Sequence, residues 1–303
     1  MGRGISGASY MKRYSYKKID AFTSEKSMGN PAACVFFEDN ETLTEGEMLY
    51  IAKQHKGFVS EMVYCGKSDT ADFKLTYYSS ECEVDFCGHG TIACMYELIN
   101  SNAQLKSKKE IIIETNKKGN LCVFNEIEKD NAVYITAPKP VYKGTKLTSE
   151  IIADQLGISV SSINIEKPID LINAGLSTLI VPIRTLKDEV NIFPNEKELK
   201  KFCQDNEIDI VLIYSSETDN NGYYMHTRVF APKFGYLEDP ATGSGNSAFG
   251  YYLLKNNMWN GDSISIEQGG IDRIYNEVKL LFQNNCVLFG GRATIRIVGD
   301  YYL

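Results

Sequence analysis

The chain has 303 residues, of which 43% are hydrophobic and 23% charged, and its formal net charge is −7. This composition is typical of a globular protein, and the length predicts two domains at roughly 100–200 residues each. The negative charge and the lack of a basic cluster argue against nucleic acid or an anionic membrane as a partner, and no apolar run approaches the roughly 20 residues of a membrane helix.

The first half of the chain predicts a series of strands with two helices among them. Residues 1–10 are polar and glycine-rich, so we expect them to form a flexible leader. Thr44 and Glu47 form a capping-box pattern for a helix that ends near Gly57. A second helix is expected after residue 91. Alternating or continuous apolar residues predict strands at 12–22, 32–37, 58–64, 72–79, 111–115, 121–127 and 132–136.

The second half of the chain repeats this order of elements. Pro138 and Pro140 interrupt regular secondary structure, and we place the boundary there between an N-terminal lobe at 11–140 and a C-terminal lobe at 141–303. Strands, then a helix, then strands, twice over, predict an α+β fold with two pseudo-symmetric lobes and indicate an internal duplication. Helices are expected at 149–156, at 196–204 and after residue 245, and strands at 177–183, 208–214, 223–230, 264–266, 274–281, 287–289 and 293–298.

Glu61 lies in the middle of a segment, F-V-S-E-M-V-Y at 58–64, that is apolar on both faces. A carboxylate in a buried strand is costly unless it is paired or can hold a proton near neutral pH. A general acid/base needs such an environment, so the position favours a catalytic glutamate. An edge-strand glutamate that points to water explains the segment equally well.

Two glycine-rich loops each precede an apolar helix. The first reads C-G-H-G-T at 87–91, and the second reads D-P-A-T-G-S-G at 239–245. A helix start presents unpaired N–H groups and a partial positive charge, which suits an anion. We expect the two half-chains to bring these loops to one cleft, with His89 held near whatever binds there. Ordinary tight turns that cap core helices are the alternative for either loop.

Several common functional motifs are not supported. The G-x-G-x-x-A match at 243–248 does not directly follow a strand, as a dinucleotide-binding loop must. There is no G-x-S-x-G nucleophile elbow, and the eight cysteines form no C-x-x-C pair, which argues against a zinc site. Cys87 and His89 are two residues apart in a tight turn, a poor geometry for a nucleophile and its base. We expect no metal, and reduced thiols in a cytoplasmic protein, since no signal peptide is visible.

Four segments together resemble the phenazine-biosynthesis PhzF-like isomerase family, which has the diaminopimelate-epimerase-like fold. They are G-N-P-A-A at 29–33, S-E at 60–61, D-F-C-G-H-G-T at 85–91, and the stretch from Arg228 to Ser244. The resemblance spans most of the chain. It implies two lobes, each a curved, mostly antiparallel sheet or barrel around a central helix, with the active site between them. It further implies a biosynthetic enzyme that forms a homodimer and needs no cofactor.

The resemblance also implies roles for individual residues. Glu61 would be the acid/base that takes a proton from one carbon of a small, cyclic unsaturated carboxylic acid and returns it to another. His89 and Asp239 would orient polar ring substituents. Backbone N–H groups at the helix starts would hold the substrate carboxylate. The substrate-binding residues implied are Asn30, Gly88, Gly90, Gly243 and Ser244.

Racemases and epimerases of the same fold use two cysteines, one on each loop. Cys87 matches the first, but Thr242 stands at the place of the second, and a hydroxyl is far too weak an acid and base to replace a thiolate. Two-thiol racemisation is therefore disfavoured, and Cys87 is expected to be a small packing residue. A two-base epimerase and a non-catalytic acid-binding protein remain alternatives. We also expect Gly90 to loosen the first loop.

Overall fold

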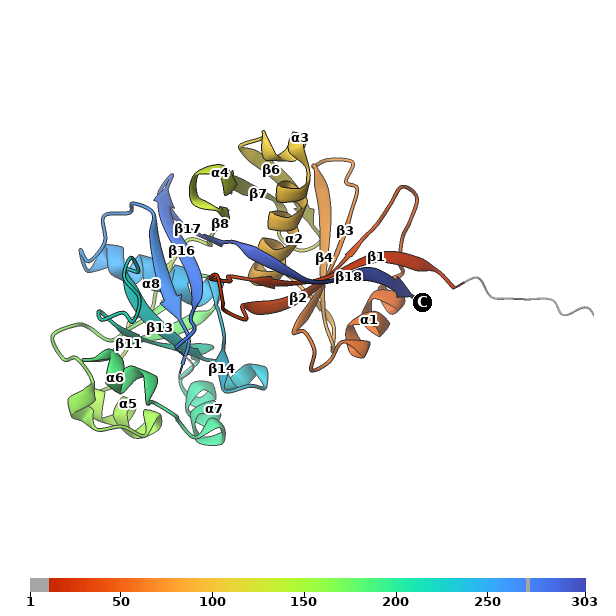
Figure 1. Ribbon diagram of the computed structural model, residues 1–303. Coiled ribbons are helices and arrows are strands. Elements are labelled where there is room, and N and C mark those ends of the chain that lie inside the picture. The colour runs from red at the N-terminus through yellow and green to blue at the C-terminus, as the bar shows by residue number, and fades with distance from the viewer. Residues whose placement is uncertain (1–10, 271–272) are drawn as a thin grey trace, which may run out of the picture.

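The computed structural model of the protein describes residues 11–270 and 273–303 and shows two lobes side by side (Figure 1). The predicted leader at 1–10 lies outside the described residues. The strands form one hydrogen-bonded network. They are β1 (Arg13–Ala21), β2 (Asn30–Phe36), β3 (Glu61–Gly66), β4 (Phe73–Ser79), β5 (Glu83–Val84), β6 (Glu110–Thr115), β7 (Gly119–Glu126), β8 (Ala132–Thr136), β9 (Val141–Tyr142), β10 (Asp170–Asn173), β11 (Ser177–Pro182), β12 (Ile210–Ser215), β13 (Met225–Phe230), β14 (Glu238–Asp239), β15 (Ile264–Gln268), β16 (Asn276–Gln283), β17 (Cys286–Gly291) and β18 (Ala293–Tyr302).

Helices fill the connections between these strands. They are α1 (Glu45–Gln54), α2 (Gly88–Ser101), α3 (Ala103–Lys106), α4 (Ile127–Asp130), α5 (Ser149–Leu156), α6 (Leu186–Val190), α7 (Glu196–Asp205) and α8 (Gly243–Lys255), with short 3-10 helices η1 (Val160–Ser162) and η2 (Pro232–Phe234). The predicted α+β class is confirmed. No helix in the described ranges is long and apolar enough to cross a membrane.

The strands of the two lobes pair in the same order. In the N-terminal lobe, antiparallel β1–β2 is followed by parallel β2–β3, antiparallel β3–β4 and parallel β4–β6. In the C-terminal lobe, antiparallel β10–β11 is followed by parallel β11–β12, antiparallel β12–β13 and parallel β13–β15. This repeated order of pairings confirms the internal duplication that the element order predicted.

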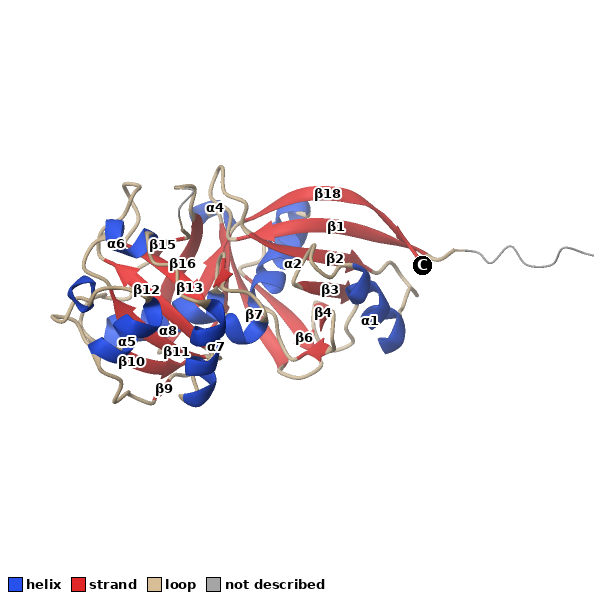
Figure 2. Cartoon of the chain, turned by 90° about the horizontal axis from the view of Figure 1, so that it is seen from below, coloured by secondary structure: helices blue, strands red, loops and turns tan. Residues whose placement is uncertain are grey.

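Each lobe also receives a strand from the end of the other repeat. The short β9, which follows the first repeat, pairs with β10 of the second. The long β18, which follows the second repeat, runs antiparallel along β1 of the first (Figures 1 and 2). Residues 293–302, which the division at residue 140 placed in the C-terminal lobe, therefore pair within the N-terminal lobe. The rest of that division stays a prediction.

A single central helix lies inside each lobe. Helices α2 and α8 are buried along most of their length. Side chains of both, Ile92 and Phe249 among them, belong to one continuous hydrophobic core. Burial of this apolar surface is the main force that holds the two lobes in contact. The N-terminal ends of both central helices are consequently held in fixed positions by the core.

Peripheral helices pack on the outer faces of the sheets and form smaller hydrophobic cores there. Helix α1 packs on β3 and β4 through Ile51, and its start has the predicted capping box between Thr44 and Glu47. Helices α5 and α7 pack on each other in the C-terminal lobe, where Ile152 and Leu199 share a core. These elements stabilise the lobes and supply none of the predicted site residues.

The strand that carries Glu61 begins later than its apolar pattern predicts. The N–H groups of Phe58 and Val59 both donate to the carbonyl oxygen of His55, so these residues complete the turn after α1. Strand β3 then begins at Glu61. The predicted position of Glu61 in the middle of a strand is therefore wrong, because a turn takes up the first apolar residues of the segment.

Candidate active site

Cys87, in the first loop, caps the start of helix α2. It is the N-cap residue of α2, and its Sγ accepts a hydrogen bond from the Gly90 N–H at 3.3 Å. A Cβ atom at position 90 would lie 2.7 Å from Cγ2 of Val63 and 3.0 Å from the Cys87 Sγ. Close packing, and not flexibility, requires glycine here. The expectation that Gly90 loosens the loop is therefore wrong.

Thr242 is the N-cap residue of α8, but its side chain does not cap the helix. Its hydroxyl donates to Oδ2 of Asp239, and its side chain makes no capping hydrogen bond. Gln268 holds the loop instead, because its Oε1 accepts from the Thr242 N–H at 3.0 Å and its Nε2 donates to the Asp239 carbonyl oxygen at 2.9 Å. The first turn of α8 contains no acidic residue. The positive end of this helix is therefore free to attract an anionic group.

The aromatic ring of Phe289, on β17, lies between the two loops. A Cβ atom at Gly88 would lie 3.1 Å from this ring, and one at Gly243 would lie 2.6 Å from it. Phe289 is only 3% exposed, so the ring cannot easily move aside. Both helix starts thus pack on one ring, which sets their separation. Close contact with this ring explains why both helices begin with glycine.

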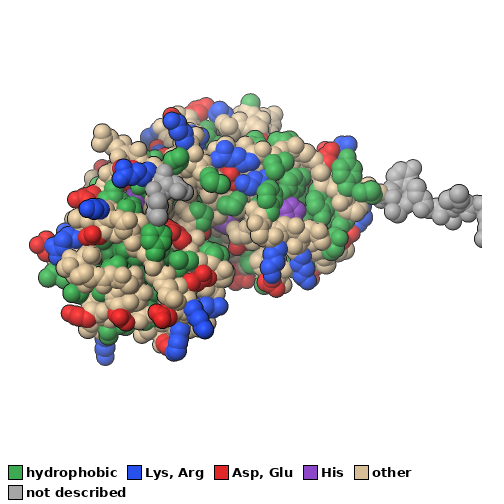
Figure 3. All heavy atoms as spheres, turned by 60° about the horizontal axis from the view of Figure 1, so that its bottom comes forward, with side chains coloured by type: hydrophobic (Ala, Val, Ile, Leu, Met, Phe, Trp, Pro, Cys, Tyr) green, Lys and Arg blue, Asp and Glu red, His purple; other side chains and the backbone are tan. Residues whose placement is uncertain are grey.

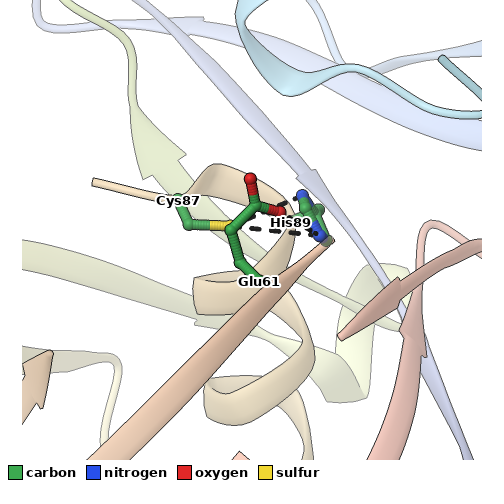
Figure 4. A group of neighbouring side chains, drawn as sticks. All are labelled: Glu61, Cys87 and His89. Atoms are coloured by element: carbon green, nitrogen blue, oxygen red, sulfur yellow. Dashed lines mark hydrogen bonds and ion pairs between the residues drawn. The ribbon is translucent and has the colours of Figure 1, made fainter. Parts of the chain in front are cut away.

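Glu61, Cys87 and His89 form a cluster at the first loop (Figure 4). The Oε2 atom of Glu61 lies 3.4 Å from Nε2 of His89, and it is buried without a hydrogen-bond partner in the described chain. The Cys87 Sγ lies 3.5 Å from Nδ1 of His89, so the expected poor geometry between these two residues is wrong. The hydroxyl of Ser60 adds a further contact, 3.2 Å from Nε2 of His89.

The Cys87 thiol is held in its neutral form. Burial, reinforced by the negative charge of Glu61, raises the pKa of this thiol well above its usual value. A protonated thiol is a poor nucleophile and a poor base. The raised thiol pKa therefore agrees with the expectation that Cys87 is a small packing residue.

Asp239 joins the second loop to the N-terminal lobe. Its Oδ1 accepts a hydrogen bond from Nδ2 of Asn30 at 3.1 Å, and the same Nδ2 donates to a loop carbonyl at 2.8 Å. Burial raises the pKa of Asp239 to about 6, although the residue as a whole keeps intermediate exposure. The hydrogen bond from Thr242 and the charge of His89 oppose this rise, and the charge of Glu61 adds to it. Asp239 therefore shares one electrostatic environment with the two groups on the other lobe.

Most of the residues that the sequence singled out make contact in pairs. Asn30 bonds to Asp239, Glu61 lies against His89, and Gly88 and Gly243 pack on the same ring. Gly90 is buried by packing, and Ser244 is half-buried in the first turn of α8. The catalytic and binding roles of these residues stay predictions.

Sequence reasoning missed three residues of this region: Phe289, Gln268 and Tyr236. Tyr236 lies between β13 and β14 and is 40% exposed. Burial raises the pKa of its hydroxyl well above the usual value, and the charges of Asp239 and Glu61 act in the same direction. The Tyr236 hydroxyl therefore lies close enough to Asp239 and Glu61 for their charges to affect its pKa. The local signals for these residues were two glycine pairs, at 269–270 directly after Gln268 and at 290–291 directly after Phe289.

An open cavity of about 480 Å³ lies away from this cluster. Residues from both halves of the chain line it, among them Lys26, Asp130, Tyr223 and Arg292. As far as the chain is described, none of the predicted site residues lines this cavity. Its charged side chains are of both signs, and the face drawn in Figure 3 shows the same mixture of acidic and basic groups.

Solved structures of known proteins share this two-lobed fold. The chain matches the crystal structure of a Bacillus anthracis phenazine biosynthesis protein of the PhzF family with a TM-score of 0.82, at 26% identity, over 97% of this chain and 99% of that one. A hydroxyproline epimerase from Agrobacterium vitis shares the fold alone, with a TM-score of 0.54 at 12% identity over 96% of this chain and 93% of that one. The protein therefore has the epimerase-like fold that the resemblance implied.

The amino-acid sequence matches one protein family over most of its length. Residues 19–296 match the family described as phenazine biosynthesis-like protein, and the chain belongs to this family. Uncharacterized isomerase YfhB of Bacillus subtilis is 32% identical over 262 residues, which are 86% of this chain and 87% of that protein. Antisense-enhancing sequence 1 of Schizosaccharomyces pombe is 31% identical over 248 residues, 80% of this chain and 81% of that protein. The chain is thus a PhzF-like isomerase without an assigned substrate.

Proposed function

We propose that the protein is a cofactor-independent isomerase that moves a proton on a small, cyclic unsaturated carboxylic acid, with Glu61 as the single acid/base. The observation that carries this proposal is the buried Oε2 atom of Glu61, which lacks a hydrogen-bond partner among the described residues. An unpartnered buried carboxylate oxygen is costly in a folded protein. A substrate proton would supply the missing partner.

The proposed reaction balances within the substrate. Glu61 takes a proton from one carbon, the double-bond electrons shift along the conjugated system, and the protonated carboxyl group returns the proton to another carbon. His89, 3.4 Å from the reacting oxygen, holds the Glu61 carboxyl group in position during both steps. Asp239 and Asn30 orient polar groups of the substrate.

The helix starts hold the substrate carboxylate in this proposal. The start of α8 has no side-chain cap, and neither α2 nor α8 has an acidic residue in its first turn. Backbone N–H groups of Gly88, Gly90, Gly243 and Ser244 were the predicted donors. The Gly90 N–H already donates to Cys87, so we assign the carboxylate to the remaining three positions.

A two-base epimerase is the second candidate, and the raised pKa of Asp239 favours it. With a pKa of about 6, Asp239 can exchange protons near neutral pH from the loop that faces Glu61. Such an enzyme would invert one carbon and leave every double bond in place. The product therefore separates the two candidates, since a shifted double bond supports the isomerase and inversion without a shift supports the epimerase.

We also propose that the protein acts on a biosynthetic intermediate in the cytoplasm, as a homodimer, without nucleic acid or membranes as partners. The family resemblance supports the dimer, and the interspersed surface charge in Figure 3 suits a protein that does not bind polyanions. Light scattering coupled to size-exclusion chromatography measures the mass in solution. The mass of a single chain would refute the dimer.

Proton NMR in D2O tests the isomerase. The protein is incubated with a panel of cyclic unsaturated acids that includes dihydro-hydroxyanthranilate. We expect deuterium incorporation or a shifted double bond with the wild type, and a loss of about 10²-fold or more with Glu61→Gln, as for removal of a general acid/base. Glu110→Gln, which changes an exposed glutamate on β6, is the matched control and should keep full activity.

Two results would contradict the proposal. Full activity of Glu61→Gln would remove Glu61 from the chemistry. Line broadening of a bound acid without any deuterium exchange across the panel would instead indicate a different substrate or a non-catalytic acid-binding protein.

A further inference from the structure

Glu61, Cys87 and His89 offer three kinds of metal-ligand atom at one point. A carboxylate oxygen, a thiol sulfur and an imidazole nitrogen all lie within 4.8 Å of one another (Figure 4). Glu61 comes from β3, and the other two come from the start of α2, so no sequence motif for metal binding reveals the set. The proposed proton transfer uses Glu61 and His89 but leaves Cys87 without a chemical role.

The distances agree with the edges of a tetrahedral zinc site. With bonds of about 2.3 Å to sulfur and about 2.0–2.1 Å to nitrogen and oxygen, tetrahedral angles separate nitrogen and oxygen ligands by about 3.4 Å and sulfur and nitrogen ligands by about 3.6 Å. The Glu61 Oε2 lies 3.4 Å from Nε2 of His89, and the Cys87 Sγ lies 3.9 Å from the same nitrogen. The third edge, between the Cys87 sulfur and the Glu61 oxygen, is within 4.8 Å, so a side-chain movement of about 1 Å would close the cluster around one ion.

The surroundings of the cluster favour a divalent cation. Within the described residues, His89 is the only ion-pair partner of Glu61. Asp239 supplies a second carboxylate that interacts electrostatically with both Glu61 and His89. A bound ion would also satisfy the Glu61 Oε2, the buried oxygen that lacks a hydrogen-bond partner. Three protein ligands leave a fourth position for water, as in open zinc sites.

We propose that Glu61, Cys87 and His89 bind Zn²⁺ or another thiophilic divalent ion, and that the bound ion switches off proton transfer. On binding, a sulfur–metal bond forms at Cys87 and the thiol proton passes to water, with no change of oxidation state. The ion also occupies the Glu61 oxygen that would accept the substrate proton. Inhibition rests on the proposed function, whereas metal binding does not.

Titration with Co²⁺ alone tests the site directly. A cobalt–thiolate bond gives a charge-transfer band in the near ultraviolet, and tetrahedral coordination gives intense visible bands. The full-length, untagged, reduced and metal-free protein should show both, and added Zn²⁺ should abolish them. Cys87→Ser should lose the charge-transfer band, and Glu61→Gln should weaken Co²⁺ binding by at least about tenfold. Cys82→Ser, which removes an exposed cysteine outside the cluster, is the control and should keep both.

The outcomes separate the metal site from the enzyme activity. Wild-type protein without the charge-transfer band, or a band that survives in Cys87→Ser while circular dichroism shows a folded variant, overturns the metal site. The expected bands together with Zn²⁺ that leaves Glu61-dependent deuterium exchange unchanged overturn the switch. The expected bands in a protein without exchange activity support the metal site and contradict the proposed proton transfer on these acids.

Discussion

Replacing Asp239 by asparagine should stabilise the protein at neutral pH. Burial raises the pKa of Asp239 from 3.8 to about 6 in the folded chain. The folded state therefore binds this proton more tightly than the unfolded state does, so the stability contributed by Asp239 is fully present below about pH 4 and is lost as the pH rises through 6. A shift of about two pKa units corresponds to about 2–3 kcal/mol of unfolding free energy. Asparagine removes this cost and keeps the oxygen that accepts from Asn30.

Urea unfolding followed by circular dichroism measures the effect. We expect Asp239→Asn to be more stable than wild type by about 2–3 kcal/mol at pH 7.5, and the difference to disappear near pH 4. The same variant should lose activity, because functional groups are often kept at the expense of stability. Asp69→Asn, which changes an exposed aspartate, should show no such pH dependence. Equal or lower stability of Asp239→Asn at pH 7.5 would refute the reasoning.

Two further predictions concern the supports of the second loop. Gly243→Ala places a Cβ atom 2.6 Å from the ring of Phe289, so it should lower the free energy of unfolding by about 1–3 kcal/mol and remove most of the activity. Adding Phe289→Leu should restore part of the stability and part of the activity. A double variant that is worse than either single variant would show that the ring does not set the loop spacing. Arg228→Met should cost about 3–5 kcal/mol in urea unfolding, because the fully buried guanidinium of Arg228 donates to two buried carbonyl oxygens at 2.7 Å as well as to Glu238 at 2.9 Å. Arg13→Met, which removes an exposed ion pair, should cost less than about 1 kcal/mol, and equal losses in the two arginine variants would contradict this account.

Local patterns were sufficient to predict most elements and both loops. The capping box of Thr44 and Glu47, the glycine at 157 that ends α5, and the glycine-rich starts of α2 and α8 all depend on contacts within a few residues. The repeated order of strands and helices also revealed the duplication, since the order of elements follows from the chain alone. The short elements β5, β9, β10, β14, α3, α4 and α6 were not predicted, because runs of two to five residues show no clear periodicity.

The arrangement of the site depended on contacts that no local pattern contains. Glu61 was singled out for its apolar neighbours, but only the turn at His55 decided that it begins β3. Their spacing predicted a poor geometry for Cys87 and His89 as a nucleophile and its base, and the folded loop brings their side chains to 3.5 Å. Phe289, far along the chain, was identified only by its contacts with both helix starts.

The sequence by itself determined most of the longer elements, the duplication, the family and the two loops, because short-range geometry and residue identity encode each of them. Only the tertiary structure decided that β18 pairs with β1, that Asn30 bonds to Asp239, and that burial raises the pKa of Asp239 to about 6. Hydrogen bonding between distant strands and the exclusion of water from a carboxyl group depend on which segments meet. These long-range contacts place the buried Oε2 atom of Glu61 beside two helix starts.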